Sequence, residues 1–158
     1  AYLVYDKNGG LINSGDYIVK PSGFVIPKEA SRIHGITTEK ALDEGVELNE
    51  VLVDFEKKIA AAEVLVAHNL KFDEKIMGAE LLRNQFKNSL TSKKGICTME
   101  TSVDFCGLMG GYGLKWPKLS ELHYKLFGFN FEAAHNAAAD INATAKCFWE
   151  LKRIGVIK

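Results

Sequence analysis

The chain has 158 residues, which is about the length of one domain and enough to bury a hydrophobic core. Its 20 acidic and 20 basic side chains cancel, which argues against a protein that coats duplex nucleic acid through a global positive field. No apolar run reaches the roughly 18 residues of a membrane span, and we expect no signal peptide. The three cysteines are widely spaced and form no C-x-x-C motif, which favours buried free thiols in a reducing cytoplasm.

The pattern at the start of the chain predicts a β-hairpin. Apolar residues gather in AYLVYD (1–6) and GLINSGDYIVKP (10–21), on either side of the sequence NGG at 8–10. Asparagine and glycine readily adopt the backbone conformations that tight hairpin turns need. We therefore expect the chain to begin inside the first arm of a hairpin, as a fragment of a longer protein would.

The next part of the chain predicts three helices. Residues 26–45 have the pattern of two short helices, the first with Pro27 near its start, where proline is tolerated. Residues 47–62 predict a longer helix, because apolar residues recur on one helical face. These apolar residues are Leu48, Val51, Leu52, Phe55 and Ile59.

Two strands with a helix between them follow. Residues 63–67 and 95–99 are compact apolar runs, typical of strands buried in a partly parallel sheet. Residues 69–86 predict the intervening helix. Its buried face is expected to contain Phe72, Ile76, Ala79 and Phe86.

The last third of the chain is predicted to be largely helical. We expect one helix over 99–109, a glycine-rich loop after it, and a short helix closed by Gly128. The alanine-rich stretch after residue 133 predicts a final helix that ends near Gly155. A hairpin followed by alternating strands and helices indicates a single α/β domain with a mixed sheet and helices packed on it.

Two aspartates and one histidine are the strongest candidates for chemistry. Asp73 follows the strand at 63–67, at the end of the sheet where functional groups collect in α/β folds, and Asp140 lies in the first turns of the final helix. A simpler interpretation is that both carboxylates only lie in the first turns of their helices, where the helix dipole favours negative charge, and that Asn69 and Asn136 cap these helices. Carboxylates are the ligands that Mg²⁺ prefers, and His135 could accept a proton from water, so the combination suits metal-assisted phosphodiester hydrolysis.

Two short motifs carry a resemblance to a known family. The sequences HNLKFD (68–73) and HNAAAD (135–140) resemble the second and third motifs of the DnaQ-like 3′–5′ exonucleases. The likeness is to the histidine-containing DEDDh branch, to which the proofreading epsilon subunit of bacterial DNA polymerase III belongs. The matching residues are Asn69, Phe72 and Asp73 in N-x-x-F-D, and His135, Ala137 and Asp140 in H-x-A-x-x-D.

The resemblance implies a fold, a reaction and a set of partners. The fold would be ribonuclease H-like, a mixed sheet with helices on both faces. Two Mg²⁺ or Mn²⁺ ions would be held in part by Asp73 and Asp140, and His135 would take the proton of the attacking water. Nucleoside 5′-monophosphates would be released from the 3′ ends of single-stranded DNA or RNA, with a DNA polymerase as a candidate partner. Oligomeric state is not readable from the sequence.

Substrate contacts are also implied by the resemblance, although each has a structural alternative. Asn69 and Phe72 belong to the second motif, and His34 belongs to the segment IPKEASRIHGIT (26–37), which is also similar to the family. No acidic residue stands beside His34 in the sequence, so a structural role in its loop is the alternative.

The first motif of the family, D-x-E on the first strand, has no counterpart in this chain. Asp6 and Asp16 flank the hairpin turn and lack the glutamate partner. We therefore expect residues 1–158 to be a single exonuclease domain that lacks its first strand, and to be inactive or nearly so. The hairpin and the strands at 63–67 and 95–99 should join one sheet, with a gap if the first strand is absent. A naturally degenerate relative, a non-catalytic binding module and an RNA-specific exoribonuclease are the alternatives.

Three further positions have open interpretations. We expect His68, at the end of a buried strand, to be a hydrogen-bonded core residue, and His123 to lie on the surface of its helix. Trp116, between Lys115 and Lys118, could stack on a nucleic-acid strand or anchor the core.

Overall fold

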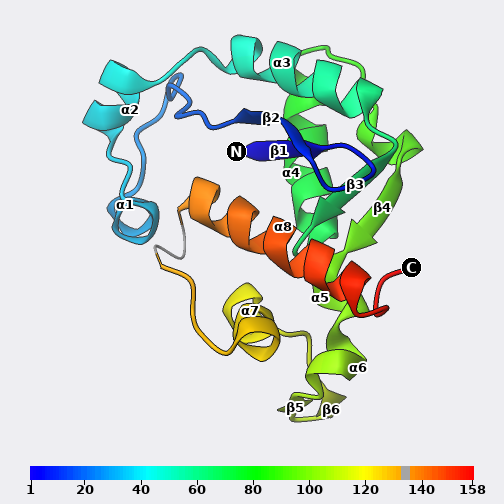
Figure 1. The fold of residues 1–158 in the computed structure, drawn as a ribbon. Coiled ribbons are helices and arrows are strands. Elements are labelled where there is room, and N and C mark those ends of the chain that lie inside the picture. Colours follow the sequence, from blue (N-terminus) through cyan, green and yellow to red (C-terminus); the bar gives the residue numbers. More distant parts are fainter. Residues whose placement is uncertain (133–135) are drawn as a thin grey trace.

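The computed structural model describes residues 1–132 and 136–158 (Figure 1). Its first element is the predicted hairpin, in which β1 (Tyr2–Tyr5) pairs antiparallel with β2 (Leu11–Gly15). The turn is held by the Asp6 carboxylate, which accepts the backbone N–H groups of Asn8 and Gly10, each at 2.8 Å. The local chemistry of the turn therefore produces the expected strand pairing.

Three helices follow the hairpin, as predicted. The hydroxyl of Thr37 accepts the backbone N–H of Lys40 at 3.1 Å and so caps the second of them. On the third helix the predicted apolar face is buried, with Leu52 and Ile59 at its centre. The helices are α1 (Lys28–His34), α2 (Thr38–Glu44) and α3 (Leu48–Ala61).

A parallel strand pair forms the centre of the fold. β3 (Val64–Ala67) pairs with β4 (Lys94–Cys97), and the chain between them forms α4 (Leu70–Arg83) and the short helix η1 (Leu90–Ser92). α4 packs on both strands. Such a crossover requires a connection of this length, because parallel strands cannot be joined by a tight turn.

The predicted buried face of α4 is partly wrong. Phe72 is 60% exposed and Ile76 is 51% exposed, whereas Gly78 and Leu81 are buried. Ala79 and Phe86, the other two predicted positions, are partly buried. The helix carries apolar residues on more than one face, so periodicity alone could not show which face meets the sheet.

The predicted helix over 99–109 is also wrong, because two short helices replace it. The chain leaves helical geometry at Ser102, whose hydroxyl donates to the Thr98 carbonyl at 2.6 Å. The expected glycine-rich loop contains a very short hairpin, and the two later helices form as predicted. These elements are α5 (Thr98–Thr101), α6 (Val103–Cys106), β5 (Met109–Gly110), β6 (Gly113–Leu114), α7 (Leu119–Phe127) and α8 (Ala137–Arg153).

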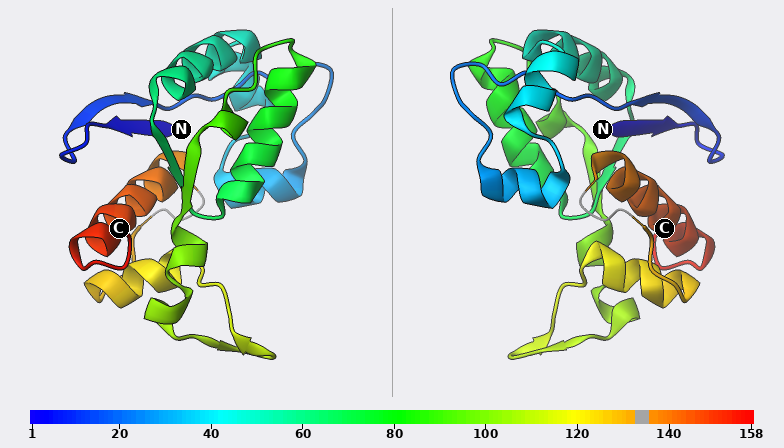
Figure 2. Two further views of the ribbon diagram at one scale, coloured as in Figure 1. Left: turned by 90° about the vertical axis from the view of Figure 1, so that its right-hand side faces the viewer. Right: turned by 90° about the vertical axis from the view of Figure 1, so that its left-hand side faces the viewer.

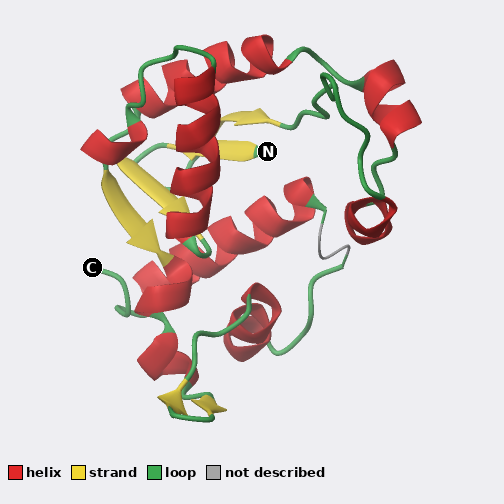
Figure 3. Cartoon of the chain, turned by 180° about the vertical axis from the view of Figure 1, so that it is seen from behind, coloured by secondary structure: helices red, strands yellow, loops and turns green. Residues whose placement is uncertain are grey.

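The strands do not form one continuous sheet. Within the described residues, β1–β2 and β3–β4 are separate two-stranded sheets, so the expectation of a single sheet is wrong. Helix α8 contacts both β1 and β3, and thereby joins the two sheets. Figure 2 shows α4 and α8 on opposite sides of the β3–β4 pair, and Figure 3 shows α4 in front when the molecule is seen from behind. The mixed α/β architecture with helices on both faces is confirmed.

A separate hydrophobic core covers each face of the β3–β4 pair. One core lies under α3 and α4 and the other under α6, α7 and α8, with Leu65 of β3 against the first and Ile96 of β4 against the second. The first core is centred on Leu52, Ile59, Leu81 and Leu90, and the second on Cys106, Leu122, Cys147, Leu151 and Ile157.

His123 is buried, which contradicts the expected surface position. Its ring is 1% exposed and packs against Phe127, Phe129 and Phe131, with centroid distances of 4.7, 5.4 and 5.2 Å. Its Nδ1–H donates to the Phe129 carbonyl at 3.0 Å. The spacing of Leu119, Leu122, His123, Leu126 and Phe127 is the helical stripe that could have revealed this burial.

All three cysteines are free and buried, as expected. Burial raises the pKa of the Cys147 thiol to about 12. Within residues 1–132 and 136–158, no helix is both long and apolar enough to cross a bilayer.

Candidate active site

The turn after β3 places Asp73 in the first turn of α4. Asn69 adopts the left-handed conformation, with φ of 75°, and its carbonyl accepts the Phe72 N–H at 2.9 Å. The Asn69 side chain makes no capping hydrogen bond to the helix, so the simpler interpretation of Asn69 as a cap is wrong. Asparagine tolerates this conformation better than most residues, and strained turns of this kind are frequent at functional sites.

The Asp73 carboxylate is partly desolvated although water still reaches it. Desolvation is the largest influence and raises its pKa, whereas a hydrogen bond from its own backbone N–H and the positive charge of the Ala1 amino group lower it. A carboxylate that is costly to ionise in the absence of a cation is suited to holding one.

Asp140 lies in the first turn of α8, where the backbone is well ordered by a cap. The Asn136 Oδ1 atom accepts the N–H groups of Ala138 and Ala139 at 3.0 and 3.1 Å, so the predicted capping role of Asn136 is confirmed. The N–H of Asp140 donates to the Asn136 carbonyl at 2.9 Å. The half-buried Asp140 is thus fixed on a helix start lined with alanines.

The start of β1 connects the surroundings of the two aspartates. Ala1 borders a small cavity of about 140 Å³ between the hairpin and α8, which Ile141 and Asn142 line next to Asp140. The Ala1 amino group is also near enough to Asp73 to lower the pKa of its carboxyl. The hairpin start, the first turn of α4 and the first turns of α8 therefore meet in one region. His135, the predicted proton acceptor, lies outside the described residues.

His68 ties this region to the segment before α7. Its Nε2–H donates to the Pro117 carbonyl at 3.0 Å, and its Nδ1 lies 3.0 Å from the Thr98 hydroxyl. Burial lowers the pKa of the imidazole, which favours the neutral ring that these contacts need. His68 is partly buried and hydrogen-bonded at both ring nitrogens, which confirms the expected structural role.

The two other candidate substrate contacts differ in exposure. Phe72 projects from the first turn of α4 with 60% of its surface exposed, next to Asp73. His34 is half-buried, and its Nδ1 accepts the N–H of Ile36 at 3.1 Å, which orders the turn after α1.

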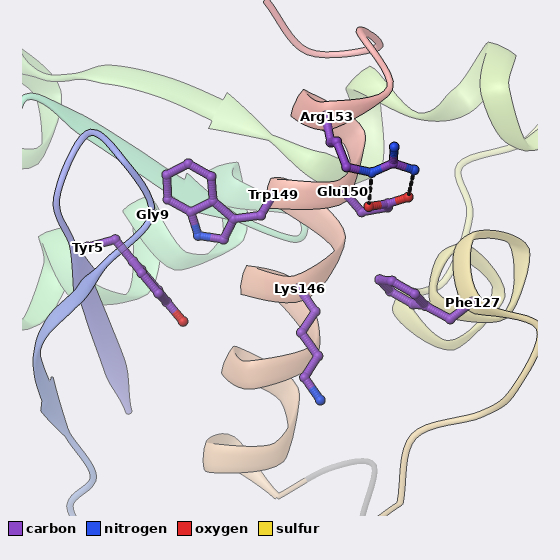
Figure 4. A pocket seen from close by; sticks show the side chains of 7 residues that line it. All are labelled: Tyr5, Gly9, Phe127, Lys146, Trp149, Glu150 and Arg153. Carbon is purple, nitrogen blue, oxygen red and sulfur yellow. Dashed lines mark hydrogen bonds and ion pairs between the residues drawn. The ribbon is translucent and has the colours of Figure 1, made fainter.

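A second cavity, of about 410 Å³, lies at the other half of α8 (Figure 4). Tyr5 and Gly9 of the hairpin border it on one side, and Trp149 of α8 lies across from Gly9. The charge of Arg153 is neutralised by Glu150 through two hydrogen bonds of 2.6 and 2.8 Å. This cavity has a different lining from the region of the two aspartates.

The donor set at the candidate site is small. Within residues 1–132 and 136–158, no three histidine, cysteine or acidic side chains gather as a metal-binding group would. Asp73 and Asp140 supply carboxylate oxygens, which suit hard divalent cations such as Mg²⁺ and Mn²⁺. The residues fit such an ion as a partial ligand set.

A family model and several solved structures match this chain. The model of the RNase T family, described as exonuclease, matches residues 4–148. The chain belongs to this exonuclease family. The match confirms the resemblance at the level of the DnaQ-like superfamily. The members of this family are nucleases, which are hydrolases. No curated protein matches the sequence significantly.

The fold of this exonuclease domain is that of E. coli Exonuclease I. The complex of that enzyme with a dA16 oligonucleotide matches with a TM-score of 0.74 and 18% identity over 94% of this chain and 35% of the other. The zinc-bound complex of that enzyme with single-stranded DNA matches with a TM-score of 0.72 and 20% identity, over 91% of this chain and 34% of the other. A product-bound structure of Exonuclease I matches with a TM-score of 0.71 and 16% identity, over 91% of this chain and 36% of the other. The chain thus spans about a third of the length of these matched chains, and the ribonuclease H-like fold is confirmed.

Proposed function

We propose that this chain is the nuclease domain of a metal-dependent 3′–5′ exonuclease that removes nucleoside 5′-monophosphates from single-stranded DNA. The observation that carries the proposal is the Asp73 carboxylate in the first turn of α4, directly after the left-handed Asn69 at the end of β3, in a chain of the exonuclease family. The structural neighbours support single-stranded DNA as the substrate, since Exonuclease I is seen with dA16 and dT13 oligonucleotides.

Each site residue has a distinct part in the proposed reaction. Asp73 and Asp140 would hold Mg²⁺ or Mn²⁺, which when bound lowers the pKa of water and offsets charge on the leaving oxygen. His135 accepts the proton of the attacking water, because imidazole titrates near neutral pH. Phe72 offers an exposed ring for the terminal base, and Asn69 shapes the turn that carries it. His34, the last residue of α1, would contact the substrate.

The lack of a D-x-E motif leads to a second part of the proposal. The family resemblance places two more acids on a first strand, and the separation of β1 from β3 supports a position for that strand between them, covered by α8. We infer that the active enzyme includes this strand, that residues 1–158 alone are nearly inactive, and that a DNA polymerase is a candidate partner. A reducing cytoplasm would keep the three buried thiols free.

One observation favours a second candidate function. Because no group of three or more metal-ligating side chains forms within residues 1–132 and 136–158, a non-catalytic module that binds nucleic-acid ends is the alternative. RNA ends would be bound through the same contacts to the sugar–phosphate backbone, so the experiment below also includes an RNA strand.

The test is hydrolysis of a 3′-labelled single strand in Mg²⁺ or Mn²⁺. A chain extended to include the D-x-E strand should release labelled mononucleotide, and chelator should stop it. His135→Ala should lower turnover by roughly 10²–10⁴-fold, the usual contribution of a positioned general base, with little change in binding. The turnover of Asp140→Asn should be reduced most at low metal concentration.

Matched controls separate the enzyme from the binding module. Asp104→Asn changes an exposed carboxylate in the first turn of α6 and should retain parental turnover. An RNA strand of equal length tests the ribonucleotide alternative. An extended chain without activity in Mn²⁺, or a His135→Ala variant as fast as the parent, would favour the binding module.

A further inference from the structure

Residues 108–118 form a protruding segment, here called the aromatic hairpin, that exposes large apolar side chains to solvent. Tyr112 is fully exposed, Trp116 is 63% exposed and Met109 is 72% exposed. Figures 1 and 2 show the strands of this segment, β5 and β6, extending from the body of the domain below α6 and α7. The exposure of Trp116 rules out the role of core anchor.

The aromatic hairpin is anchored at its base and open at its tip. Lys115 donates its backbone N–H to the Leu108 carbonyl at 2.9 Å, and Pro117 is fully buried beside the exposed Trp116. At the tip, side chains added at Gly111 or Gly113 would meet no atom within 4 Å. A ligand can therefore approach the rings without a steric barrier.

The base of the aromatic hairpin is connected to the candidate active site. The Pro117 carbonyl accepts the Nε2–H of His68 at 3.0 Å, and His68 precedes Asn69 at the turn that carries Asp73. The backbone next to Trp116 is thus fixed to the strand end from which the candidate metal ligand projects.

The aromatic hairpin has a weak positive charge that comes from Lys118, because Glu121 neutralises Lys115. Residues 105–120 contain two lysines, Lys115 and Lys118, and no acidic residue. Lys115 forms an ion pair of 2.6 Å with Glu121, which fixes the segment against α7. Lys118 is exposed on the side of Trp116 that leads to α7.

We propose that the aromatic hairpin binds the single-stranded part of the substrate, with bases stacked on Tyr112 and Trp116 and backbone phosphates near Lys118. The inference rests on the proposed exonuclease function and extends it to a second contact outside the metal site. Single-strand binding surfaces combine aromatic rings with positive charge, and their stacking is tolerant of sequence. Flat rings, adjacent glycines and the exposed Lys118 favour a nucleic-acid strand over a protein partner, because lysine is depleted in protein–protein interfaces.

Binding of a fluorescently labelled dT13 oligonucleotide in chelator tests the proposal without hydrolysis. The double variant Tyr112→Ala/Trp116→Ala should lose roughly 30-fold or more in affinity, because each of the two stacked bases contributes about fivefold or more. Binding of a thymidine dinucleotide in Ca²⁺, which we expect to occupy the candidate metal site alone, should change by less than about twofold. Tyr124→Ala removes a comparably exposed ring from α7, 58% exposed, and should bind dT13 like the parent.

A second measurement does not depend on the folding of the double variant. Trp149→Phe leaves Trp116 as the single tryptophan, and stacking should quench its fluorescence when dT13 is added. An unquenched Trp116, or a folded double variant that binds dT13 as tightly as the parent, would overturn the inference, even if the extended chain hydrolyses DNA. A parent dimer that dissociates in the double variant, with dT13 binding unchanged, would instead assign the rings to a protein contact. Failure of the extended chain to bind or hydrolyse any strand would reject the proposed function as well.

Discussion

Replacing Asp73 with asparagine should separate the electrostatic cost of this carboxylate from its use in metal binding. Partial desolvation raises the pKa of Asp73 in the folded protein above its ordinary value. The ionised group therefore destabilises the fold at neutral pH, and the destabilisation fades as the pH falls through the folded-state pKa toward the unfolded value of about 4. In chelator at neutral pH, Asp73→Asn should unfold at the parental temperature or above it, and this difference should vanish near pH 4.

With divalent metal bound, the parent should melt at a higher temperature than Asp73→Asn. When its free concentration is ten times its dissociation constant, a ligand that binds only the folded state stabilises that state by about 1.4 kcal/mol. For a domain of this size, that raises the melting temperature of the parent by roughly 3–6 °C. The Asp73→Asn variant lacks one of the two candidate carboxylate ligands, so Mn²⁺ should raise its melting temperature by less than about a third of this amount.

Thermal unfolding followed by circular dichroism, in chelator and in a series of Mn²⁺ concentrations, measures both effects. Asp104→Asn is the control, because it removes another exposed carboxylate from the first turn of a helix. The reasoning is refuted if Asp73→Asn gains as much from Mn²⁺ as the parent, or if it melts lower than the parent in chelator at neutral pH.

Two further substitutions test the turn and the hairpin. Asn69→Ala should lower the free energy of unfolding in urea by about 1 kcal/mol, whereas Asn69→Gly should stay within about 0.5 kcal/mol, because φ is 75° at this position; equal losses would contradict the backbone argument. The hydroxyls of Tyr2 and Tyr17 donate to the Asp54 carboxylate, and these bonds lower its pKa. The resulting stabilisation is present above about pH 4 and is lost as the pH falls through the lower folded-state pKa. Asp54→Asn should flatten the melting temperature between pH 6 and pH 2, and a parental acid dependence in the variant would exclude this role.

The parts of the fold that depend on local backbone chemistry were predictable from the sequence. The NGG turn at 8–10 specifies the first hairpin, Asn136 caps α8, and Gly128 takes the left-handed conformation that ends α7. Each of these features depends on residues within one turn of chain. The helix-start positions of Asp73 and Asp140 were predictable in the same way, whereas their candidate role in metal binding came from the family resemblance of the two motifs.

The errors concern contacts between distant segments. Phe72 and Ile76 were expected in the core, yet α4 turns a neighbouring face, with Leu81, toward the sheet. His123 was expected at the surface because histidine is polar, but its hydrogen bond to Phe129 satisfies one ring nitrogen and permits burial. The pairing of strands into two sheets depends on which strands lie side by side, and one strand pattern does not specify its neighbour.

The position of α8 has a consequence for the order in which this domain is completed on the ribosome. The hairpin and the β3–β4 pair each form from nearby segments, so both can be made while the later part of the chain is still being translated. The helix that contacts both of them, α8, follows both in the sequence, and it also carries Asp140 and the core residues Cys147 and Leu151. A nascent chain that stops before residue 137 therefore holds one candidate metal ligand and an open core. The candidate metal site and the tertiary stability of the domain should therefore be completed in the same late step of synthesis.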